Sequence, residues 1–396
     1  MRKVIFLVLI GLATTGYALD SYWDQLLNLY QFDKSKQSYC YRNKLGRIVG
    51  ENIDLQVRPA SVTKLYVSLW ALETLKKDHR FKTRFYIYEN HLHIEGGHDP
   101  YFTTENLYYL ISTLNDMGYE EFDSISFDKN FYFNWSDDSQ EITDLLNGYF
   151  NTTDWNQAHL IEFENLVFQN QNLGINLPLR DEIQFQVSSI SLASRPKKTP
   201  IMTGTFQSSP LSSHLKQMNI YSTNFIAQKV FDYLGGVDKF SAYIKEKFNA
   251  GEETISFQNG AGFEPNVTTC RLTINVIERL KFQIQKQGLQ LPDLISVPGE
   301  DLGTLQHRYQ NHLAKTLVAK TGTLRHTSAL SGLLSTKLGE KPFGIFNHSY
   351  DIDNAIKIQD HYVQHLFVSL GDPQSYMYYR SDYIPLIESD LEYVNQ

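Results

Sequence analysis

A serine and a lysine lie one helical turn apart at the head of a long apolar run. Residues 59–64 have the sequence Pro-Ala-Ser-Val-Thr-Lys, and leucines recur at spacings of three and four over 65–75. This periodicity predicts a buried helix, and proline commonly precedes a helix start. Because Ser61 and Lys64 are three residues apart, we expect both side chains on one face of that helix.

This pair can supply a nucleophile and its base. A serine hydroxyl attacks only after its proton is removed, and a buried lysine amine can accept that proton because burial disfavours the charged ammonium. The helix N-terminus also favours negative charge near Ser61. A lone Ser-x-x-Lys pattern occurs in solvated helices too, so its meaning depends on motifs further along the chain.

Composition excludes several classes of protein. The chain has 396 residues, of which 42% are hydrophobic and 20% charged. These values are typical of a globular protein, here with two domains, and not of a disordered chain or a multi-span membrane protein. The net charge of −8 argues against nucleic acid as the main partner.

The N-terminus has the pattern of an export signal. Two basic residues precede an apolar run at 4–13, and the small residues Gly16 and Ala18 follow at the spacing of a cleavage site. We expect a signal peptide at 1–19 and export to the periplasm, or secretion with cell-wall association. The run is too short to span a bilayer comfortably, so no integral membrane span should remain after cleavage. An ordinary buried N-terminal helix is the alternative.

Cys40 and Cys270 are the two cysteines of the chain. A disulfide persists in an exported protein, so a bridge between them is possible. The sequence does not give their separation, and we therefore favour two unpaired buried thiols.

Periodicity and turn residues predict the remaining elements. We expect strands within 38–57, a hairpin at 85–88 and 91–94, a strand at 122–127, helices from Thr104 and at 22–30, 210–218, 223–234, 237–248, 269–287 and 351–370, and strands at 316–324, 328–336 and 343–348. Residues 129–200 show no clear pattern, and residues 371–396 form a tail without a periodicity.

Two further motifs accompany the serine and lysine. Ser-Thr-Asn at 222–224 lies between predicted helices, where Ser222 by itself would simply cap a helix. Lys-Thr-Gly at 320–322 lies on a predicted strand, where a lysine by itself would be solvated. In this order the three motifs match the Ser-x-x-Lys, Ser-x-Asn and Lys-Thr-Gly set of serine acyl-transfer enzymes.

Each polar member of the set has an expected catalytic role. Ser61 attacks a carbonyl carbon and carries the acyl group, while Lys64 accepts its proton. Ser222 and Lys320 relay a proton to the leaving amine. The Asn224 amide holds both a substrate carbonyl and Lys64.

The strand residues are expected to bind substrate. Gly322 has no side chain, so an extended substrate can pair with the strand edge. Lys320 and the hydroxyls of Thr321 and Thr323 suit a substrate that ends in a free carboxylate. The backbone N–H groups of Ser61 and Thr323 are the expected oxyanion hole, worth ~3–4 kcal/mol per donor.

The chain resembles the class C low-molecular-weight penicillin-binding proteins, the D-alanyl-D-alanine carboxypeptidase/endopeptidase family. Residues 59–64 resemble that family's P-A-S-x-x-K, and residues 96–100 resemble its G-G-x-D-P turn. Residues 297–305 resemble its P-V-A-G-x-D-G-T-L segment, and residues 320–332 resemble its final strand pair. The similarity covers about 20–128 and 205–370.

This resemblance implies an α/β fold. The expected architecture is a DD-peptidase/transpeptidase-like (β-lactamase-like) domain with an antiparallel sheet flanked by helices, formed from 20–80 and 205–370. An inserted α+β domain would occupy 81–204, with 371–396 as a C-terminal tail. The gap between Lys64 and Ser222 leaves room for one insert, so a second one found in larger family members should be missing or vestigial.

The resemblance also implies the partners. These are peptidoglycan stem peptides as substrates and β-lactams as covalent inhibitors, with no metal or cofactor. His91 and His93 alternate on a strand, but no ligand set with metal-binding spacing accompanies them. One departure concerns 259–265, where Asn-Gly-Ala-Gly-Phe-Glu-Pro replaces the family's D-G-S-G-L-S-R. The missing arginine helps bind the diamino acid in the family, so which diamino acid is accepted stays open.

The sequence therefore predicts an exported serine DD-peptidase that acts through a Ser61 acyl-enzyme. It would cleave the D-Ala-D-Ala terminus, a D-Ala–diamino acid crosslink, or both. A β-lactamase or esterase on the same fold is one alternative, although we find no acidic motif dedicated to activating water. A catalytically silent peptidoglycan-binding protein is the other.

Overall fold

The computed structural model describes residues 19, 21–172, 179–380 and 390–395, which form two compact units. The first contains Met1–Lys77 and Leu215–Arg380, and the second contains Asp78–His214 and Ser381–Gln396. Apart from Leu19, the predicted signal peptide lies outside the described residues.

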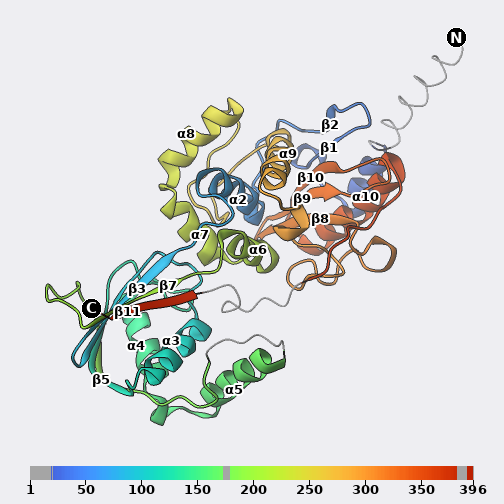
Figure 1. Cartoon of the computed structure of the whole chain (residues 1–396). Helices are drawn as coiled ribbons and strands as arrows, with labels where there is room; N and C mark the ends of the chain where they lie inside the picture. Colours follow the sequence, from blue (N-terminus) through green and yellow to red (C-terminus); the bar gives the residue numbers. More distant parts are fainter. Residues whose placement is uncertain (1–18, 20, 173–178, 381–389, 396) are drawn as a thin grey trace, which may run out of the picture. The chain divides into compact units, whose positions relative to one another are not determined.

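The first unit is built on a five-stranded antiparallel sheet in the order β2-β1-β10-β9-β8 (Figure 1). Its strands are β1 (Ser38–Arg42), β2 (Ile48–Glu51), β8 (Leu317–Leu324), β9 (Thr327–Leu334) and β10 (Lys341–His348). The N-terminal β1 pairs with the C-terminal β10, which brings both ends of the unit into one sheet. Strand β8, which carries the Lys-Thr-Gly motif, is an edge strand.

Helices cover both faces of this sheet. Because side chains alternate along a strand, Ile345 of β10 joins the core under one face, while its neighbour Gly344 faces Cys270 on the other. Helix α10 (Ile352–Leu370) and the helical residues 21–30 cover the first face, and α9 (Cys270–Lys286) covers the second.

The other helices of the first unit complete its second layer. Helix α2 (Thr63–Thr74) packs on α9 and α7. Helix α6 (Leu211–Tyr221) belongs to this unit from Leu215 onward. The others are α7 (Asn224–Tyr233) and α8 (Gly236–Phe248), with short 3-10 helices η1 (Lys34–Lys36), η2 (Ala60–Val62), η4 (Leu291–Asp293) and η5 (Asn311–Leu313).

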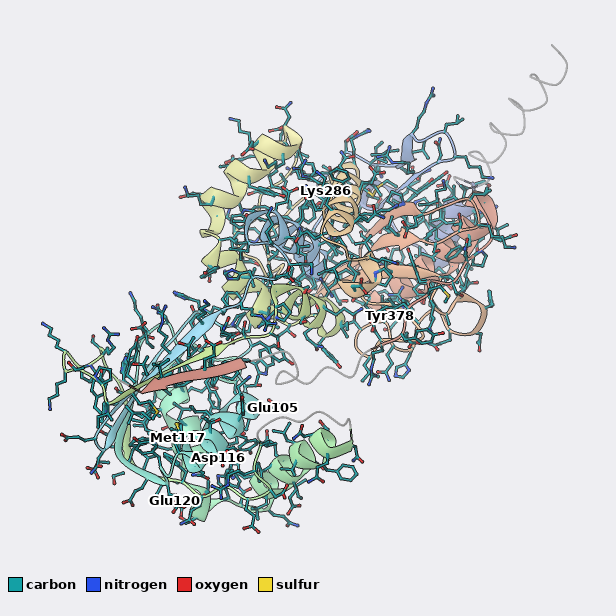
Figure 2. The ribbon with its side chains drawn as sticks, in the orientation of Figure 1. Glu105, Asp116, Met117, Glu120, Lys286 and Tyr378 are labelled. Carbon is teal, nitrogen blue, oxygen red and sulfur yellow. A yellow bond between two sulfur atoms is a disulfide. The ribbon has the colours of Figure 1, made fainter. Side chains whose placement is uncertain are left out.

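The second unit is a six-stranded mixed sheet in the order β11-β7-β3-β4-β5-β6. Its elements are β3 (Lys82–Tyr88), β4 (His91–Glu95), α3 (Thr104–Asp116), β5 (Glu121–Phe127), α4 (Ser139–Phe150), η3 (Thr152–Asp154), α5 (Gln157–Asn172), β6 (Gln186–Leu192), β7 (Met202–Gln207) and β11 (Asp390–Asn395). Figure 2 shows Glu105 and Asp116 at the two ends of α3, whose apolar side chains fill the core of this unit.

The α/β class and most predicted elements are confirmed. The hairpin at 85–94 is β3–β4, and the three strands expected over 316–348 are β8, β9 and β10. The segment 129–200, which had no clear pattern, contains α4, α5 and β6. The predicted tail includes β11, which pairs along its length with β7.

The preference for unpaired thiols is wrong. Cys40 on β1 and Cys270 at the start of α9 form a disulfide. Their pairing follows from the topology, because β1 lies beside β10 and α9 packs across both strands. Two residues 230 positions apart in sequence thereby join the sheet to its covering helix.

Among the residues described, no helix is both long enough and apolar enough to cross a membrane.

Removing the disulfide should destabilise the first unit. The bond closes a very long loop, and loss of such a bond from a folded domain costs about 2–5 kcal/mol of unfolding free energy. We expect Cys40→Ala/Cys270→Ala to lower the urea midpoint by a corresponding amount. Dithiothreitol should produce the same loss in the wild type and none in the double variant. Equal midpoints for the oxidised wild type and the variant would contradict this expectation.

Candidate active site

Ser61, the predicted nucleophile, lies on a tight turn. Two glycines in other segments of the chain allow those segments to pack closely against this turn. Ala60 has a φ of +46°, and Ser61 follows it in η2, just before α2. A Cβ on Gly322 of β8 would lie 2.5 Å from the Pro59 carbonyl oxygen, and one on Gly262 would lie 2.0 Å from the Ala60 carbonyl oxygen. The turn is therefore held between β8 and the 259–265 loop.

This contact corrects the reason given for Gly322. We expected the missing side chain to make room for substrate along the strand edge. In the structure the position above Gly322 is already taken by the backbone of Pro59 and Ser61, whose nitrogen would lie 3.0 Å from an added Cβ. Gly322 is required first by the packing of the nucleophile turn on β8.

The Lys64 amine is fully buried and contacts three oxygen atoms. Its Nζ lies 3.0 Å from Ser61 Oγ, 2.9 Å from Asn224 Oδ1 and 2.8 Å from the carbonyl oxygen of Ala261. Burial lowers the pKa of Lys64 to about 7. A neutral amine has two N–H donors and one lone pair. The carbonyl oxygens of Asn224 and Ala261 can only accept, which leaves the lone pair for the Ser61 hydroxyl proton.

The Ser-x-Asn motif lies at the junction of α6 and α7. Asn224 is the first residue of α7, and Thr223 is its N-cap. Because Thr223 is the N-cap of α7, the alternative in which Ser222 caps the helix is wrong. Ser222 has a φ of +59°, and its Oγ lies 2.9 Å from Lys320 Nζ.

Lys320 is a second fully buried amine. Its Nζ contacts Ser222 Oγ at 2.9 Å and the Thr321 carbonyl oxygen at 3.1 Å. Burial holds the pKa of Lys320 well below its ordinary value, and the nearby Lys64 charge lowers it further. No carboxylate neutralises these two amines among the hydrogen bonds found in the described part of the chain, so each disfavours the protonation of the other.

The remaining expected site residues lie on β8. Thr321 Oγ1 donates a hydrogen bond to Thr304 Oγ1 at 2.8 Å, and the Thr323 side chain is exposed. The structure thus brings Ser61, Lys64 and Asn224 into one hydrogen-bonded group, and Ser222 and Lys320 into a second. The proximity of Gly322 to Ser61 joins the strand to the first group.

Sequence reasoning missed the carbonyl group of Ala261. The 259–265 loop is organised by Asn259, whose Oδ1 accepts from the N–H groups of Gly262 and Phe263 at 2.8 and 2.9 Å. This arrangement presents the Ala261 oxygen to Lys64. Every residue has a backbone carbonyl, so the residue type does not indicate which carbonyl will act as an acceptor. The Asn-Gly-Ala-Gly pattern could have indicated a tight loop.

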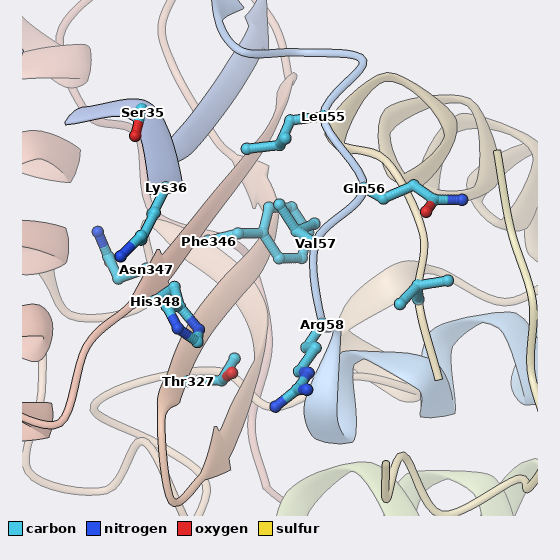
Figure 3. A pocket seen from close by; sticks show the side chains of 11 residues that line it. Ser35, Lys36, Leu55, Gln56, Val57, Arg58, Thr327, Phe346, Asn347 and His348 are labelled. Carbon is cyan, nitrogen blue, oxygen red and sulfur yellow. The ribbon is translucent and has the colours of Figure 1, made fainter. Parts of the chain in front are cut away.

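A hollow of about 390 Å³ lies beside the residues that precede the nucleophile (Figure 3). Arg58 and His348 contribute polar side chains to it, and Val57 and Phe346 contribute apolar ones. Arg58 forms an ion pair with Glu264 of the altered loop. Ser61 does not line this hollow, which makes it distinct from the group around Lys64.

The histidines considered as metal ligands are engaged otherwise. His91 Nδ1 contacts Ser124 Oγ and His93 Nδ1 contacts Ser126 Oγ, both at 2.8 Å. Within the described residues, no group of three or more histidine, cysteine, aspartate or glutamate side chains is arranged to hold a metal ion.

A family model now identifies the chain. The D-Ala-D-Ala carboxypeptidase 3 (S13) family model matches residues 44–154 and 179–366. The chain belongs to this family. It is therefore a serine peptidase of the D-Ala-D-Ala type, as the resemblance to class C penicillin-binding proteins implied.

Solved structures agree with this assignment. Bd3459, a predatory peptidoglycan endopeptidase from Bdellovibrio bacteriovorus, is 28% identical with a TM-score of 0.79, over 88% of this chain and 96% of that one. A further structure, penicillin G acylated Bd3459 in complex with the immunity protein Bd3460, is 29% identical over the same shares with the same TM-score. Penicillin-binding protein 4 from Haemophilus influenzae shares the fold, at 16% identity and a TM-score of 0.60, over 87% and 99% of the two chains. A search of curated proteins gave no match.

Adding a methyl group at Gly322 should displace the nucleophile turn. The new Cβ of Gly322→Ala would meet backbone atoms that cannot rotate away. We expect the rate of Ser61 acylation by a fluorescent penicillin to fall by about 100-fold or more, because small displacements of reacting groups cost about that much.

Gly148→Ala is the matched control. A Cβ at Gly148 in α4 would meet no atom within 4 Å, so this variant should acylate at the wild-type rate. An unchanged rate for Gly322→Ala would show that the turn does not depend on this contact.

Proposed function

We propose that this chain is an exported serine DD-peptidase that hydrolyses D-Ala-D-Ala termini, D-Ala–diamino acid crosslinks of peptidoglycan, or both. The observation that carries the proposal is the environment of the Lys64 amine. Two acceptors, Asn224 Oδ1 and the Ala261 carbonyl, use its N–H groups, and its lone pair is left for the hydroxyl of Ser61.

Acylation starts with the transfer of the Ser61 proton to Lys64. Ser61 Oγ attacks the carbonyl carbon of the penultimate D-Ala, and the carbonyl oxygen becomes an oxyanion. The N–H groups of Ser61 and Thr323 donate to that oxyanion. The approach of Gly322 to the Ser61 nitrogen supports this assignment, because it puts Ser61 next to the strand that carries Thr323.

The leaving amine needs a proton before the C–N bond breaks. Ser222 donates its hydroxyl proton to that nitrogen and is reprotonated from Lys320, whose amine lies 2.9 Å from Ser222 Oγ. The proton that Lys64 took from Ser61 replaces the one that leaves through Ser222 and Lys320, so Lys64 is neutral again when the amine has left. Water then attacks the carbonyl carbon of the Ser61 ester, and Lys64 takes the water proton. Lys64 returns that proton to Ser61 Oγ as the ester C–O bond breaks, which releases the acid product and restores Ser61.

Two features support export. The N-terminal 19 residues have the order of a signal peptide. The Cys40–Cys270 disulfide fits an oxidising compartment, since such bonds rarely persist in the cytosol. The periplasm or the outer cell wall is also where crosslinked stem peptides are found.

β-Lactams should act on this chain as covalent inhibitors of Ser61. Bd3459 is described as a peptidoglycan endopeptidase and is seen acylated by penicillin G. Its similarity over most of both chains supports the same chemistry here and favours crosslink cleavage as one activity.

Digestion of crosslinked muropeptides tests the function directly. We expect the purified protein to convert dimers to monomers, to release D-Ala from pentapeptides, or both, as measured by mass spectrometry. Ser61→Ala should abolish both reactions because it removes the nucleophile. Muropeptides that remain intact with the wild type would contradict the proposal.

A chromogenic cephalosporin separates the alternatives. Stoichiometric trapping agrees with a DD-peptidase, whereas continuous turnover would favour a β-lactamase. A wild type that neither labels with a fluorescent penicillin nor cuts muropeptides would favour a silent wall-binding protein.

The acylation rate should depend on pH through Lys64. A protonated amine cannot accept the Ser61 proton, and burial lowers the pKa of Lys64 to about 7. We therefore expect the second-order rate with penicillin to rise as pH increases through about 7, with a ~10-fold loss per pH unit below it. A midpoint near 10 would contradict the role of Lys64 as base. Lys64→Arg, which stays protonated, should be inactive across this range.

A further inference from the structure

A loop outside the three motifs is fastened to the helix that precedes Ser222. Lys216 of α6 donates hydrogen bonds to Asp301 Oδ2 at 2.7 Å and to the carbonyl oxygens of Pro292 and Ile295 at 2.6 and 2.9 Å. Asp301 is buried and also accepts from the hydroxyl of Tyr378, labelled in Figure 2, at 2.8 Å. The 292–301 backbone therefore has a fixed position on α6.

The same loop reaches the Lys-Thr-Gly strand. The Ala319 N–H donates to the Ser296 carbonyl at 3.1 Å, immediately before Lys320. Further along the loop, the Thr304 N–H donates to the Ile220 carbonyl at 3.3 Å, and Thr304 Oγ1 accepts from Thr321 Oγ1 at 2.8 Å. Thr304 thus lies between the end of α6 and β8, the two elements that carry Ser222 and Lys320.

The hydroxyl of Thr304 has a proton to donate. Because Thr321 is the donor in their hydrogen bond, the proton on Thr304 Oγ1 is not used there. Among the described residues Thr304 Oγ1 has no other hydrogen-bond partner, and its side chain is exposed. Thr323, two residues along β8, is exposed as well. A carboxylate accepts hydrogen bonds only, so it matches such donors. A chain from Thr321 through Thr304 to an anion would strengthen each bond in it.

We propose that Thr304 is a specificity-determining residue whose hydroxyl binds the carboxylate of the leaving group. The inference rests on the proposed DD-peptidase function. At a D-Ala-D-Ala terminus the scissile nitrogen is attached to a carbon that bears a free carboxylate. The same holds for a crosslink whose diamino acid has a carboxyl group on the carbon that bears the crosslinked amine. That group would lie on the Lys320 and Thr321 side of Ser61, where Thr304 adds a donor from outside the strand.

A structural role is the competing explanation, since the Thr304–Thr321 hydrogen bond also fastens the loop to β8. The two roles differ in how they depend on the ligand. A carboxylate ligand matters only for acyl donors that have the carboxylate, whereas a loose loop would impair every acyl donor.

Benzylpenicillin and its methyl ester distinguish the two roles. Both acylate through the same β-lactam carbonyl, but the ester has no charged carboxylate. We expect Thr304→Val, which keeps the branched shape and loses the hydroxyl, to lower the second-order acylation rate with benzylpenicillin about 10-fold or more. The rate with the ester should change less than about two-fold. Thr304→Ser, which keeps the hydroxyl, should restore the preference for the acid. The Ser61 adduct is quantified by intact-protein mass spectrometry.

Three results would overturn the inference. Equal losses with acid and ester would assign Thr304 a structural role, and an unchanged acid rate would put it outside the subsite. A wild type that neither penicillin acylates would instead reject the proposed function, and this inference with it. Melting temperatures of the two variants show whether folding contributes to any shared loss.

Discussion

The chemistry of this chain depends on the burial of one amine among three oxygen atoms. Lys64 comes from the first turn of α2, Asn224 from the start of α7 and Ala261 from a loop before α9. Burial removes the amine from bulk solvent, which lowers the pKa of Lys64 and favours its neutral form. The same contacts orient the lone pair of the amine, because the two carbonyl acceptors occupy the N–H groups and leave the lone pair to Ser61.

Burial and a neighbouring positive charge also lower the pKa of Lys320, the amine that contacts Ser222. When two buried amines lie close together without a carboxylate partner, protonation of both is energetically unfavourable. The pKa of Lys320 is lowered by burial and, in addition, by the charge of Lys64. When Lys64 takes the Ser61 proton, the field at Lys320 becomes less favourable for a proton there. In the proposed mechanism this change favours the proton relay from Lys320 through Ser222 at the step in which the leaving nitrogen needs a proton.

Sequence reasoning predicted the parts of the site that depend on side-chain identity. The three motifs, the edge strand β8 and the helix after Ser61 all follow from residue type and periodicity. The carbonyl of Ala261 could not be predicted, because a backbone acceptor has no residue signature. The Ser222 conformation and the close packing on Gly322 were missed for a related reason, since both arise from contacts between distant segments.

The disulfide and the pairing of strand β11 also depend on contacts between distant segments, which sequence spacing does not predict. Cys40 and Cys270 meet because β1 inserts beside β10, and sequence spacing carries no information about that pairing. Strand β11 pairs with β7, which lies at 202–207, where no strand was predicted. Local periodicity predicts which residues form strands, whereas the choice of neighbour depends on the burial of the whole sheet.

Residues 78–214 of the second unit are inserted in the chain between α2 and the later part of α6. The chain leaves after the C-terminal end of α2, whose 12 residues span roughly 18 Å from the end next to Ser61. It returns at the N-terminal end of α6, whose opposite end precedes Ser222. The departing and returning segments are hydrogen-bonded to each other, from the Leu211 N–H to the His79 carbonyl at 2.8 Å. With its ends held together, the insert imposes little closure entropy on the first unit. The hydrogen bond between these segments thus fixes the spacing of the two helices whose other ends carry Ser61 and Ser222.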